Sequence, residues 1–162
     1  MIIVHHLQNS RSQRILWLLE ELELPYDVRR YERDPKTMLA PPELRRVHPL
    51  GKAPMIEYEG RVVAETGAIV EYLVEKAGGR LGPPPKRDDV LRYRHFLHYA
   101  EGSMMPPLLA LLIVGRLGVL GRPARAPIQR MLDTHLDWLE RIHARPAYGE
   151  ALARGGDYAF AR

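Results

Sequence analysis

Histidines and hydroxyl groups are the side chains of this protein with the most evident chemical potential, because the chain contains no cysteine. Among seven histidines, His95 and His98 have a spacing that can place two metal ligands on one face of a helix. No third ligand accompanies them, so we predict a half-buried helix face there and no metal site. Without cysteine the chain has no disulfide and no thiol nucleophile of its own. Any sulfur chemistry must therefore use a thiol that arrives with the substrate.

Two expected helix beginnings carry hydroxyl groups that could hold a ligand. Ser10 follows a short apolar segment and precedes a strongly periodic one. Farther along, Glu65 and Thr66 open a second helix, where free backbone N–H groups and the helix dipole favour a bound carboxylate. Both sites are also ordinary helix caps, since Ser and Thr are preferred at that position. The residue types alone leave both interpretations open.

The elements that must position these residues are predicted by hydrophobic periodicity. Residues 2–6 are typical of a strand, and the helix that follows has one apolar face made of Ile15, Leu18, Leu19 and Leu22. Pro25 ends this helix, and residues 26–32 alternate as a second strand. A β-α-β order implies two parallel strands joined by a right-handed crossover.

The remainder of the first half predicts a hairpin and a helix. Glu59-Gly60 is a two-residue hairpin signal, and Gly78-Gly79 is a helix stop. The expected elements are a proline-rich loop over 34–50 with a short helix at 43–47, strands at 55–58 and 61–64, and a helix at 66–77. The fold class is therefore an α/β layer with the order βαβ-ββα.

The second half is predicted to be all-helical. The expected helices cover 88–114, interrupted near Pro106-Pro107, and 127–143, with a loop between them. We therefore predict an α/β domain over 1–80, a linker over 81–87 that contains three prolines, and a shortened all-α domain over 88–162.

Composition excludes several classes of function. Of the 162 residues, 46% are hydrophobic and 27% charged, which is typical of a folded globular protein. The net charge is +4 with a pI near 9.5, but the basic residues are scattered and form no stripe for nucleic acid. No apolar run has the ~20 residues that span a bilayer, and the first residues do not read as a signal peptide. We expect a cytoplasmic protein that binds neither nucleic acid nor membrane.

Four stretches in this order resemble the glutathione transferases of bacteria and fungi: HHLQNSRSQRILWLLEEL, RDPKTMLAPPELRRVHPLGKAPMI, AETGAIVEYL and YAEGSMMPPLL. The resemblance covers almost all of the chain up to residue 112, with weaker matches in IQRMLDTHLDWLE and WLERIHARPAY. It implies a thioredoxin-like first domain, glutathione as co-substrate without a metal, a small hydrophobic electrophile and a homodimer.

The resemblance also implies which residues contact glutathione. Pro54 matches a proline that is cis in thioredoxin-like folds, which would leave the Met55 backbone unpaired for an extended peptide. Glu65 and Thr66 would anchor the γ-glutamyl end, and further contacts would come from Arg14, Lys52 and Ala53. An ordinary turn proline, a helix cap and a solvated lysine remain the alternatives.

Ser10 occupies the position at which serine-type members of this family place a hydroxyl that stabilises the glutathione thiolate. A free thiol has a pKa of about 8.5, and lowering it by ~2 units requires only ~2.7 kcal/mol. Charge-assisted hydrogen bonds and a helix N-terminus can supply this amount. Asn9 and Ser12 are close enough to be alternatives, and Ser10 could also be only a helix cap.

The resemblance places the electrophile against residues of the second domain, for which Tyr99, Glu101 and Met105 are the candidates. A central helix with its Ser/Thr-x-x-Asp box is missing, since Thr134–Asp137 lies within an ongoing helix. We infer an internal deletion. The predicted function is a glutathione transferase that conjugates an electrophile or reduces a peroxide; the alternative is a non-catalytic module that binds glutathione or a protein.

Overall fold

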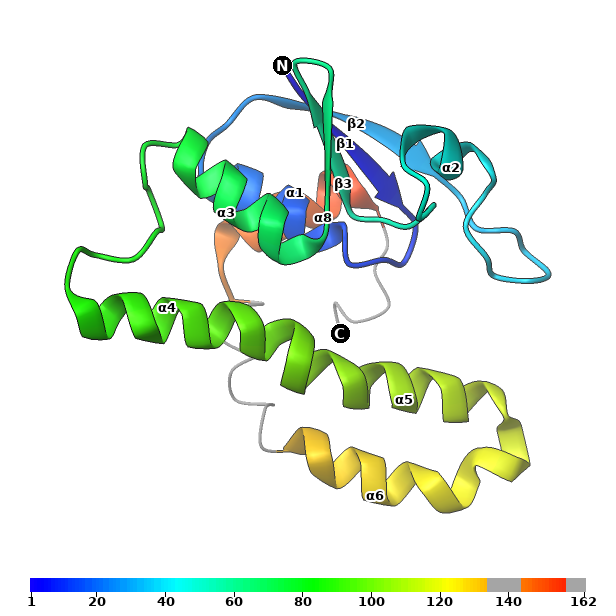
Figure 1. Ribbon diagram of the computed structural model, residues 1–162. Coiled ribbons are helices and arrows are strands. Elements are labelled where there is room, and N and C mark those ends of the chain that lie inside the picture. Colours follow the sequence, from blue (N-terminus) through cyan, green and yellow to red (C-terminus); the bar gives the residue numbers. More distant parts are fainter. Residues whose placement is uncertain (134–143, 157–162) are drawn as a thin grey trace. The chain divides into compact units, whose positions relative to one another are not determined.

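The computed structural model describes residues 1–133 and 144–156. Its strands form one sheet in the order β2-β1-β3-β4 (Figure 1), made of β1 Ile2–Leu7, β2 Tyr26–Tyr31, β3 Met55–Tyr58 and β4 Arg61–Ala64. Strands β1 and β2 are parallel, and the crossover helix α1 (Gln13–Glu21) connects them. Strand β3 is antiparallel to both β1 and β4. The predicted βαβ-ββα order and the thioredoxin-like fold class are confirmed.

The hairpin between β3 and β4 forms as its turn residues predict. Glu59 and Gly60 both have positive φ, at 50° and 72°, as a two-residue turn that matches strand twist requires. The register pairs Met55 with Ala64 and Tyr58 with Arg61. The start of β3 and the end of β4 therefore lie side by side.

Helices cover both faces of the sheet. On one face lie α1, α3 (Thr66–Lys76) and α8 (Pro146–Gly155), around a core that includes Ile2, Val4, Ile15, Leu16, Leu19, Ile69, Leu73 and Ala151 (Figure 1). On the other, the short helix α2 (Glu43–Val47) contributes Leu44 to a smaller cluster with Leu7 and Met55. Because side chains alternate along a strand, the even-numbered residues of β1 face α1 and α8.

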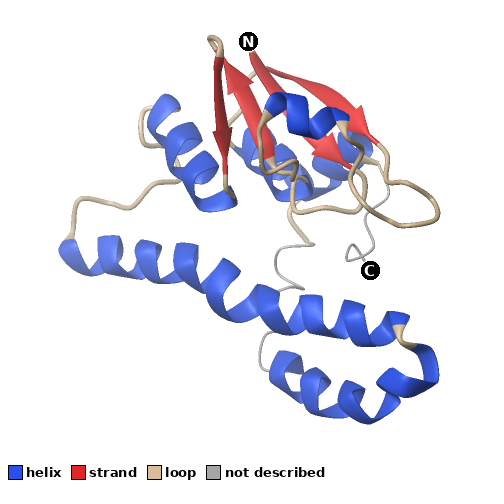
Figure 2. Cartoon of the chain, turned by 45° about the vertical axis from the view of Figure 1, so that its right-hand side comes forward, coloured by secondary structure: helices blue, strands red, loops and turns tan. Residues whose placement is uncertain are grey.

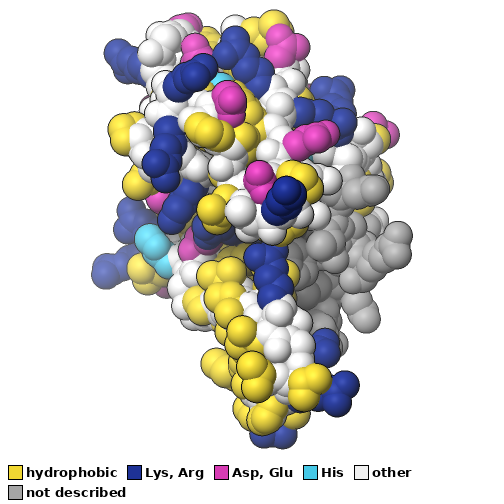
Figure 3. Space-filling model, turned by 90° about the vertical axis from the view of Figure 1, so that its right-hand side faces the viewer, with side chains coloured by type: hydrophobic (Ala, Val, Ile, Leu, Met, Phe, Trp, Pro, Cys, Tyr) yellow, Lys and Arg dark blue, Asp and Glu magenta, His cyan; other side chains and the backbone are white. Residues whose placement is uncertain are grey.

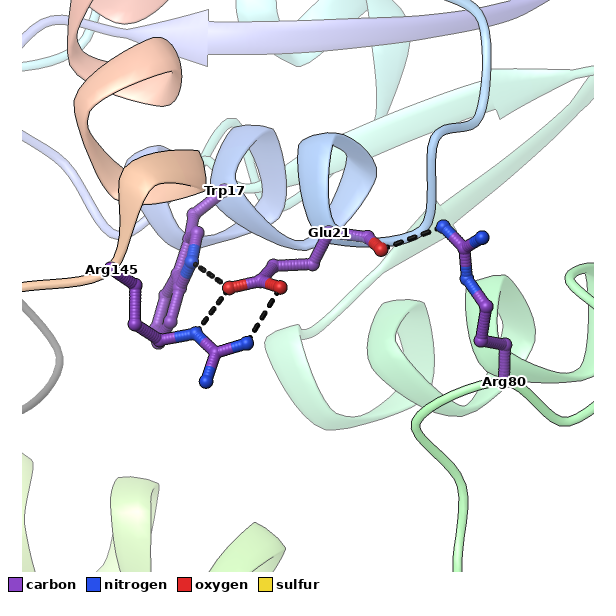
Figure 4. Close-up of polar contacts among 4 residues, drawn as sticks. All are labelled: Trp17, Glu21, Arg80 and Arg145. Carbon is purple, nitrogen blue, oxygen red and sulfur yellow. Dashed lines mark hydrogen bonds and ion pairs between the residues drawn. The ribbon is translucent and has the colours of Figure 1, made fainter.

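Helix α8 is held on α1 by an ion pair and an aromatic contact. The Glu21 carboxylate accepts hydrogen bonds from Arg145 and, at 2.9 Å, from the Trp17 indole N–H (Figure 4). The Trp17 ring meets Tyr148 edge-on, with 5.8 Å between centroids. The carbonyl of Glu21 also accepts a bond of 2.7 Å from Arg80.

The chain divides into two compact units, one made of Met1–Gly82 with the segment from Arg145 onwards and the other of Pro83–Ala144. The sequence predicted residues 88–162 as one helical domain, but α8 belongs to the sheet unit. The reason is that Tyr148, Ala151 and Gly155 form a buried face that packs on α1. The proposed limits of 1–80 and 81–87 stay predictions.

The helical unit begins with one nearly continuous helical segment. Helix α4 (Arg87–Tyr99) passes through a π-helical turn (Ala100–Met104) into α5 (Met105–Arg116). The sequence predicted an interruption at Pro106-Pro107, and the helix widens just before these prolines instead. Proline removes a hydrogen bond and crowds the preceding turn, and a π turn accommodates both effects.

A short 3₁₀ helix (Gly118–Gly121) leads into α6 (Arg122–Asp133), which returns alongside α5 (Figure 2). Helix α6 thus begins at Arg122 rather than at the predicted Pro127, which lies inside the helix. Proline in a first helical turn loses no hydrogen bond, and Pro123 fits there. The predicted continuation to residue 143, and the Thr134–Asp137 segment, lie outside the described residues.

The helical unit exposes much apolar surface. Figure 3 shows hydrophobic side chains gathered on it, and the most exposed are Val119 at 70% and Leu120 at 85%. The helical segment over residues 87–116 is also long and apolar enough to cross a membrane, and core helices of soluble proteins can have the same length and composition.

Candidate functional site

A chain of buried hydrogen bonds links the β1–α1 loop to strand β1. The Ser10 and Ser12 hydroxyl oxygens are 2.6 Å apart, and Ser12 Oγ lies 2.8 Å from Nδ1 of His6. The backbone N–H of Ser12 donates to Ser10 Oγ at 3.2 Å. Ser12 is fully buried, His6 is 3% exposed and Ser10 is 8% exposed. Ser10 is therefore the most accessible member of this chain.

The two serines ahead of helix α1 differ in how their hydroxyl groups are used. Ser12 precedes the first helical residue, but no side-chain cap bond forms there. The Ser10 hydroxyl bonds to the Ser12 N–H ahead of the helix, and the Ser12 hydroxyl turns toward His6. Both hydroxyls belong to the hydrogen-bond chain, and the bond that Ser10 accepts from the Ser12 N–H is of the kind that a helix cap makes, so the cap interpretation of Ser10 stays open.

His6 was not singled out by its position in the sequence. It lies opposite Arg30 in the parallel pair β1–β2, and the Gly155 backbone accepts a hydrogen bond from its ring. Burial lowers the pKa of His6, as does the charge of Arg30, while the bond to Gly155 opposes this shift. At neutral pH the ring is therefore uncharged.

Arg33 braces the loop that carries Ser10. Its guanidinium donates to the carbonyl oxygens of Gln8 at 2.9 Å, Asn9 at 3.2 Å and Met38 at 2.9 Å. Asn9 itself adopts a left-handed conformation with φ of 50°, which asparagine tolerates better than most residues. A single arginine gives no sequence signal for such a bracing role.

The peptide bond between Ala53 and Pro54 is cis, and Pro54 is buried. The expectation that Met55 has unpaired backbone groups is wrong, because Met55 lies in an inner strand opposite both His5 and Ala64. Both neighbours of that strand are hydrogen-bonded to it. The residue outside the ladders is Ala53, and extending the register of β1 and β3 by two residues places it beside Leu7.

Helix α3 begins next to this cis bond. Ala64 is paired with Met55, so Glu65 and Thr66 follow directly at the same edge of the sheet. Glu65 has φ of 72° and ψ of 126°, an unusual conformation for a residue with a side chain. Such strain costs about 1–3 kcal/mol and concentrates at functional sites. Thr66 is the first helical residue and is 7% exposed.

Three segments thus meet where β1 ends: the Ser10 loop, Ala53-Pro54, and the N-terminus of α3. Lys52 is exposed just ahead of the cis bond, and Arg14 is half-buried at the second residue of α1. This arrangement offers free backbone groups, a helix N-terminus that favours an anion, and a hydroxyl linked to a histidine. It can bind a short anionic peptide and handle one proton.

A family model matches the part of the chain that contains these three segments. Residues 10–76 match the model described as glutathione S-transferase, N-terminal domain, which covers all three of these segments. The chain belongs to the glutathione S-transferase family. Among its curated relatives, glutathione S-transferase 3 of Schizosaccharomyces pombe is 42% identical over 109 residues, which cover 65% of this chain and 43% of that protein. The chain spans about half the length of the curated relatives it matches.

Solved structures of glutathione S-transferases have the same fold. A glutathione S-transferase from Actinobacillus pleuropneumoniae is 28% identical with a TM-score of 0.79, covering 100% of this chain and 96% of that one. A glutathione transferase homolog from Sulfitobacter, solved with bound glutathione, is 20% identical with a TM-score of 0.69. That alignment covers 99% of this chain and 77% of that one.

The remaining candidate residues lie in the helical unit of this family member. Tyr99 ends α4, Glu101 lies in the π turn and Met105 begins α5. His95 and His98 are exposed rather than half-buried, since α4 has no buried residue, and His95 stacks on Tyr99 with 5.8 Å between ring centroids. Within the described residues no group of three or more His, Asp or Glu side chains could hold a metal.

Proposed function

We propose that this glutathione S-transferase family member binds glutathione where β1 ends and ionises its thiol beside Ser10. One observation carries the proposal: the Ser10 loop, the cis bond at Pro54 and the N-terminus of α3 meet at one edge of the sheet. Glutathione is a short peptide with carboxylates and a thiol. Each of these three segments suits one of its parts.

The peptide backbone of glutathione is proposed to pair with Ala53. An extended peptide can add to a sheet edge as a short strand when a residue there has backbone groups outside the ladder. Ala53 meets this condition and Met55 does not, because Met55 lies between two paired strands.

The γ-glutamyl end is proposed to lie at the beginning of α3. Backbone N–H groups there and the Thr66 hydroxyl can donate to its carboxylate, and the Glu65 carboxylate can pair with its ammonium group. A ligand role also accounts for the strained backbone at Glu65, which nothing in the helix itself requires. Lys52, exposed ahead of the cis bond, suits the carboxylate of the glycine end, and Arg14 adds positive charge.

The thiol is proposed to lie at Ser10, the accessible end of the buried hydroxyl chain. The thiolate then attacks an electrophilic carbon, forming a C–S bond as the leaving group departs, or attacks a peroxide oxygen, forming an S–O bond as the O–O bond breaks and the other oxygen leaves as alkoxide or hydroxide. Ser12 supports Ser10 from behind, since it is fully buried, and exposed Asn9 is the alternative contact. Tyr99, Glu101 and Met105 remain the candidates to contact the electrophile.

Ser10→Ala tests this proposal, with Ser103→Ala in the exposed part of the π turn as the matched control. Turnover in a generic conjugation assay should fall about 10- to 100-fold in Ser10→Ala, because that loss corresponds to roughly one or two units in thiol pKa. Glutathione affinity measured by calorimetry should change little. Unchanged turnover would move the role to Asn9, and the absence of any heat with glutathione in the unmodified protein would refute the assignment.

The alternative function is a glutathione-binding or protein-binding module without turnover. The exposed apolar side chains of the helical unit favour it, because such surface often marks an interface. Glutathione binding without conjugation of any common electrophile would select it. We also propose a homodimer, which light scattering at several protein concentrations would test.

A further inference from the structure

His6 is a buried titratable side chain, and Ser10 could stabilise the thiolate without it. It lies on the face of β1 that α1 and α8 cover, and each of these helices supplies one partner to its ring. Ser12 Oγ, just before α1, is 2.8 Å from Nδ1. The backbone of Gly155, the last residue of α8, accepts a hydrogen bond from the ring.

These two partners favour one placement of the hydrogens. A carbonyl oxygen can only accept, so the single N–H of an uncharged ring is given to Gly155 and Nδ1 has a free lone pair. Ser12 Oγ can donate its hydrogen to Nδ1 at 2.8 Å or to the Leu7 carbonyl at 3.5 Å, and the shorter contact favours Nδ1. Ser10, 2.6 Å from Ser12, must donate its own hydrogen to Ser12 Oγ. The Ser10 oxygen therefore faces outward as an acceptor.

We propose that His6 takes up the thiol proton of glutathione through Ser12 and Ser10. The S–H bond breaks as its proton joins Ser10 Oγ, the Ser10 hydrogen passes to Ser12 Oγ, and the Ser12 hydrogen passes to Nδ1 of His6. One thiolate and one imidazolium result, with no proton lost. The inference rests on the proposed function, since it needs a glutathione thiol at Ser10.

The same step turns Ser10 from an acceptor into a donor. After the transfer, Ser10 donates to the thiolate, Ser12 donates to Ser10, and Nδ1–H of His6 donates to Ser12. The two side-chain hydrogen bonds, between Ser10 and Ser12 and between Ser12 and His6, are kept with their directions reversed. A chain of this kind explains why two serines and a histidine are buried in contact with one another.

The two helix ends favour this separation of charge. The thiolate would lie near the N-terminus of α1, which favours negative charge, and the imidazolium lies at the C-terminus of α8, which favours positive charge. Among the groups facing His6, Arg30 on β2 opposes its protonation and the Gly155 backbone supports it. Burial opposes protonation of His6 as well, so the ring stays uncharged until the thiol is bound.

The direct test is nitrogen NMR of the histidine rings in the whole protein. In the free protein His6 should give the signals of an uncharged ring protonated at Nε2. Saturating glutathione at neutral pH should convert it to imidazolium, whereas S-methylglutathione, which has no thiol proton, should leave it uncharged. Thiolate absorbance in the ultraviolet without a change at His6 would overturn the inference.

Proton counting by calorimetry in buffers of different ionisation heat gives an independent readout. In the unmodified protein, glutathione binding should release close to zero protons to the buffer. In His6→Gln and Ser12→Ala, the number of protons released per thiolate formed should approach one. The thiolate fraction in both variants should fall about tenfold at neutral pH, which is one unit in thiol pKa. His98→Gln, on the exposed face of α4, is the matched control and should behave as the unmodified protein.

The outcomes distinguish a failure of this inference from a failure of the proposed function. Binding of neither glutathione nor S-methylglutathione would remove the proposed function, and this inference with it. Binding of both, with thiolate formed and one proton released by the unmodified protein, would overturn the relay through His6 alone. The NMR measurement needs no variant, so a folding defect in His6→Gln would not protect the inference.

Discussion

Gly155 is the position where one added methyl group should disturb the packing of α8 on the sheet unit. It is buried, and a Cβ built on it would lie 2.8 Å from Cδ1 of Leu16 and closer still to the side-chain amide of Gln13. Leu16 and Gln13 are themselves 0% and 1% exposed, so neither can swing away into solvent. Gly155→Ala must therefore push the end of α8 away from α1.

The magnitude follows from two opposing effects. Forcing an extra carbon into a packed interior costs about 1–3 kcal/mol. Replacing glycine by alanine in a helix returns about 0.5–1 kcal/mol. We expect a net loss of about 1–2 kcal/mol in the free energy of unfolding. For a chain of this size that corresponds to a fall in Tm of roughly 2–8 °C.

Gly149→Ala is the matched control in the same helix. A Cβ at Gly149 meets no atom within 4 Å, so only the helix-propensity gain remains, and the variant should be more stable by about 0.5–1 kcal/mol. Thermal and denaturant unfolding followed by circular dichroism would compare the two. If Gly155→Ala proves as stable as Gly149→Ala, α8 does not pack on Leu16 and Gln13 as described.

Two further predictions concern the sheet unit and the charge network. Leu73→Ala, at a fully buried position, should lower the free energy of unfolding by about 2–5 kcal/mol, while Leu120→Ala, at a site 85% exposed, should change it by less than about 0.5 kcal/mol. The pKa of Glu21 lies below its ordinary 4.5, chiefly because Arg145 donates to the carboxylate. Its stabilisation is therefore complete above that value and lost as the pH falls through the folded pKa. Glu21→Gln should cost about 1 kcal/mol at pH 7, given that Arg145 is half exposed, and the difference should vanish in acid denaturation curves.

Local signals in the sequence predicted most of the sheet unit. The apolar face of α1, the Glu59-Gly60 turn and the double glycine after α3 each act over a few residues, so their consequences can be read without knowing the partner. The short helix α2 was predicted at 43–47 because the prolines around it leave no room for a longer one. These elements formed within one or two residues of their expected limits.

Contacts between distant segments could not be predicted in the same way. The buried face of α8 is made of Tyr148, Ala151 and Gly155, two of which are too small to give a hydrophobic pattern. Its partner, α1, lies more than a hundred residues earlier in the chain. The bond from His6 on β1 to Gly155 on α8 also joins segments that are far apart in the sequence, so no local pattern marked His6 as a site residue.

The error at Met55 has a different origin. Pro54 correctly marked the cis bond, but which neighbour is left unpaired depends on the register of β3 with both adjacent strands. That register is set by the hairpin and by the pairing with β1, and a motif alone does not contain it. The residue outside the ladders is therefore Ala53, on the other side of Pro54 and two residues before Met55.

The inferred deletion leads to a prediction about how stability is distributed along the chain. Between Arg87 and Asp133 the large apolar side chains that are buried are Met104 and Leu132. Leu112, Ile113 and Met131 are 41–60% exposed. The described part of this unit buries so little apolar surface that it gains little free energy on folding. Amides of α5 and α6 should therefore exchange with solvent much faster than those of β1 and α1, as hydrogen exchange followed by mass spectrometry would show. Equal protection of both units at the level of global unfolding would mean that a second copy of the chain, or another partner, covers this surface, and a dilution series would then have to restore the fast exchange.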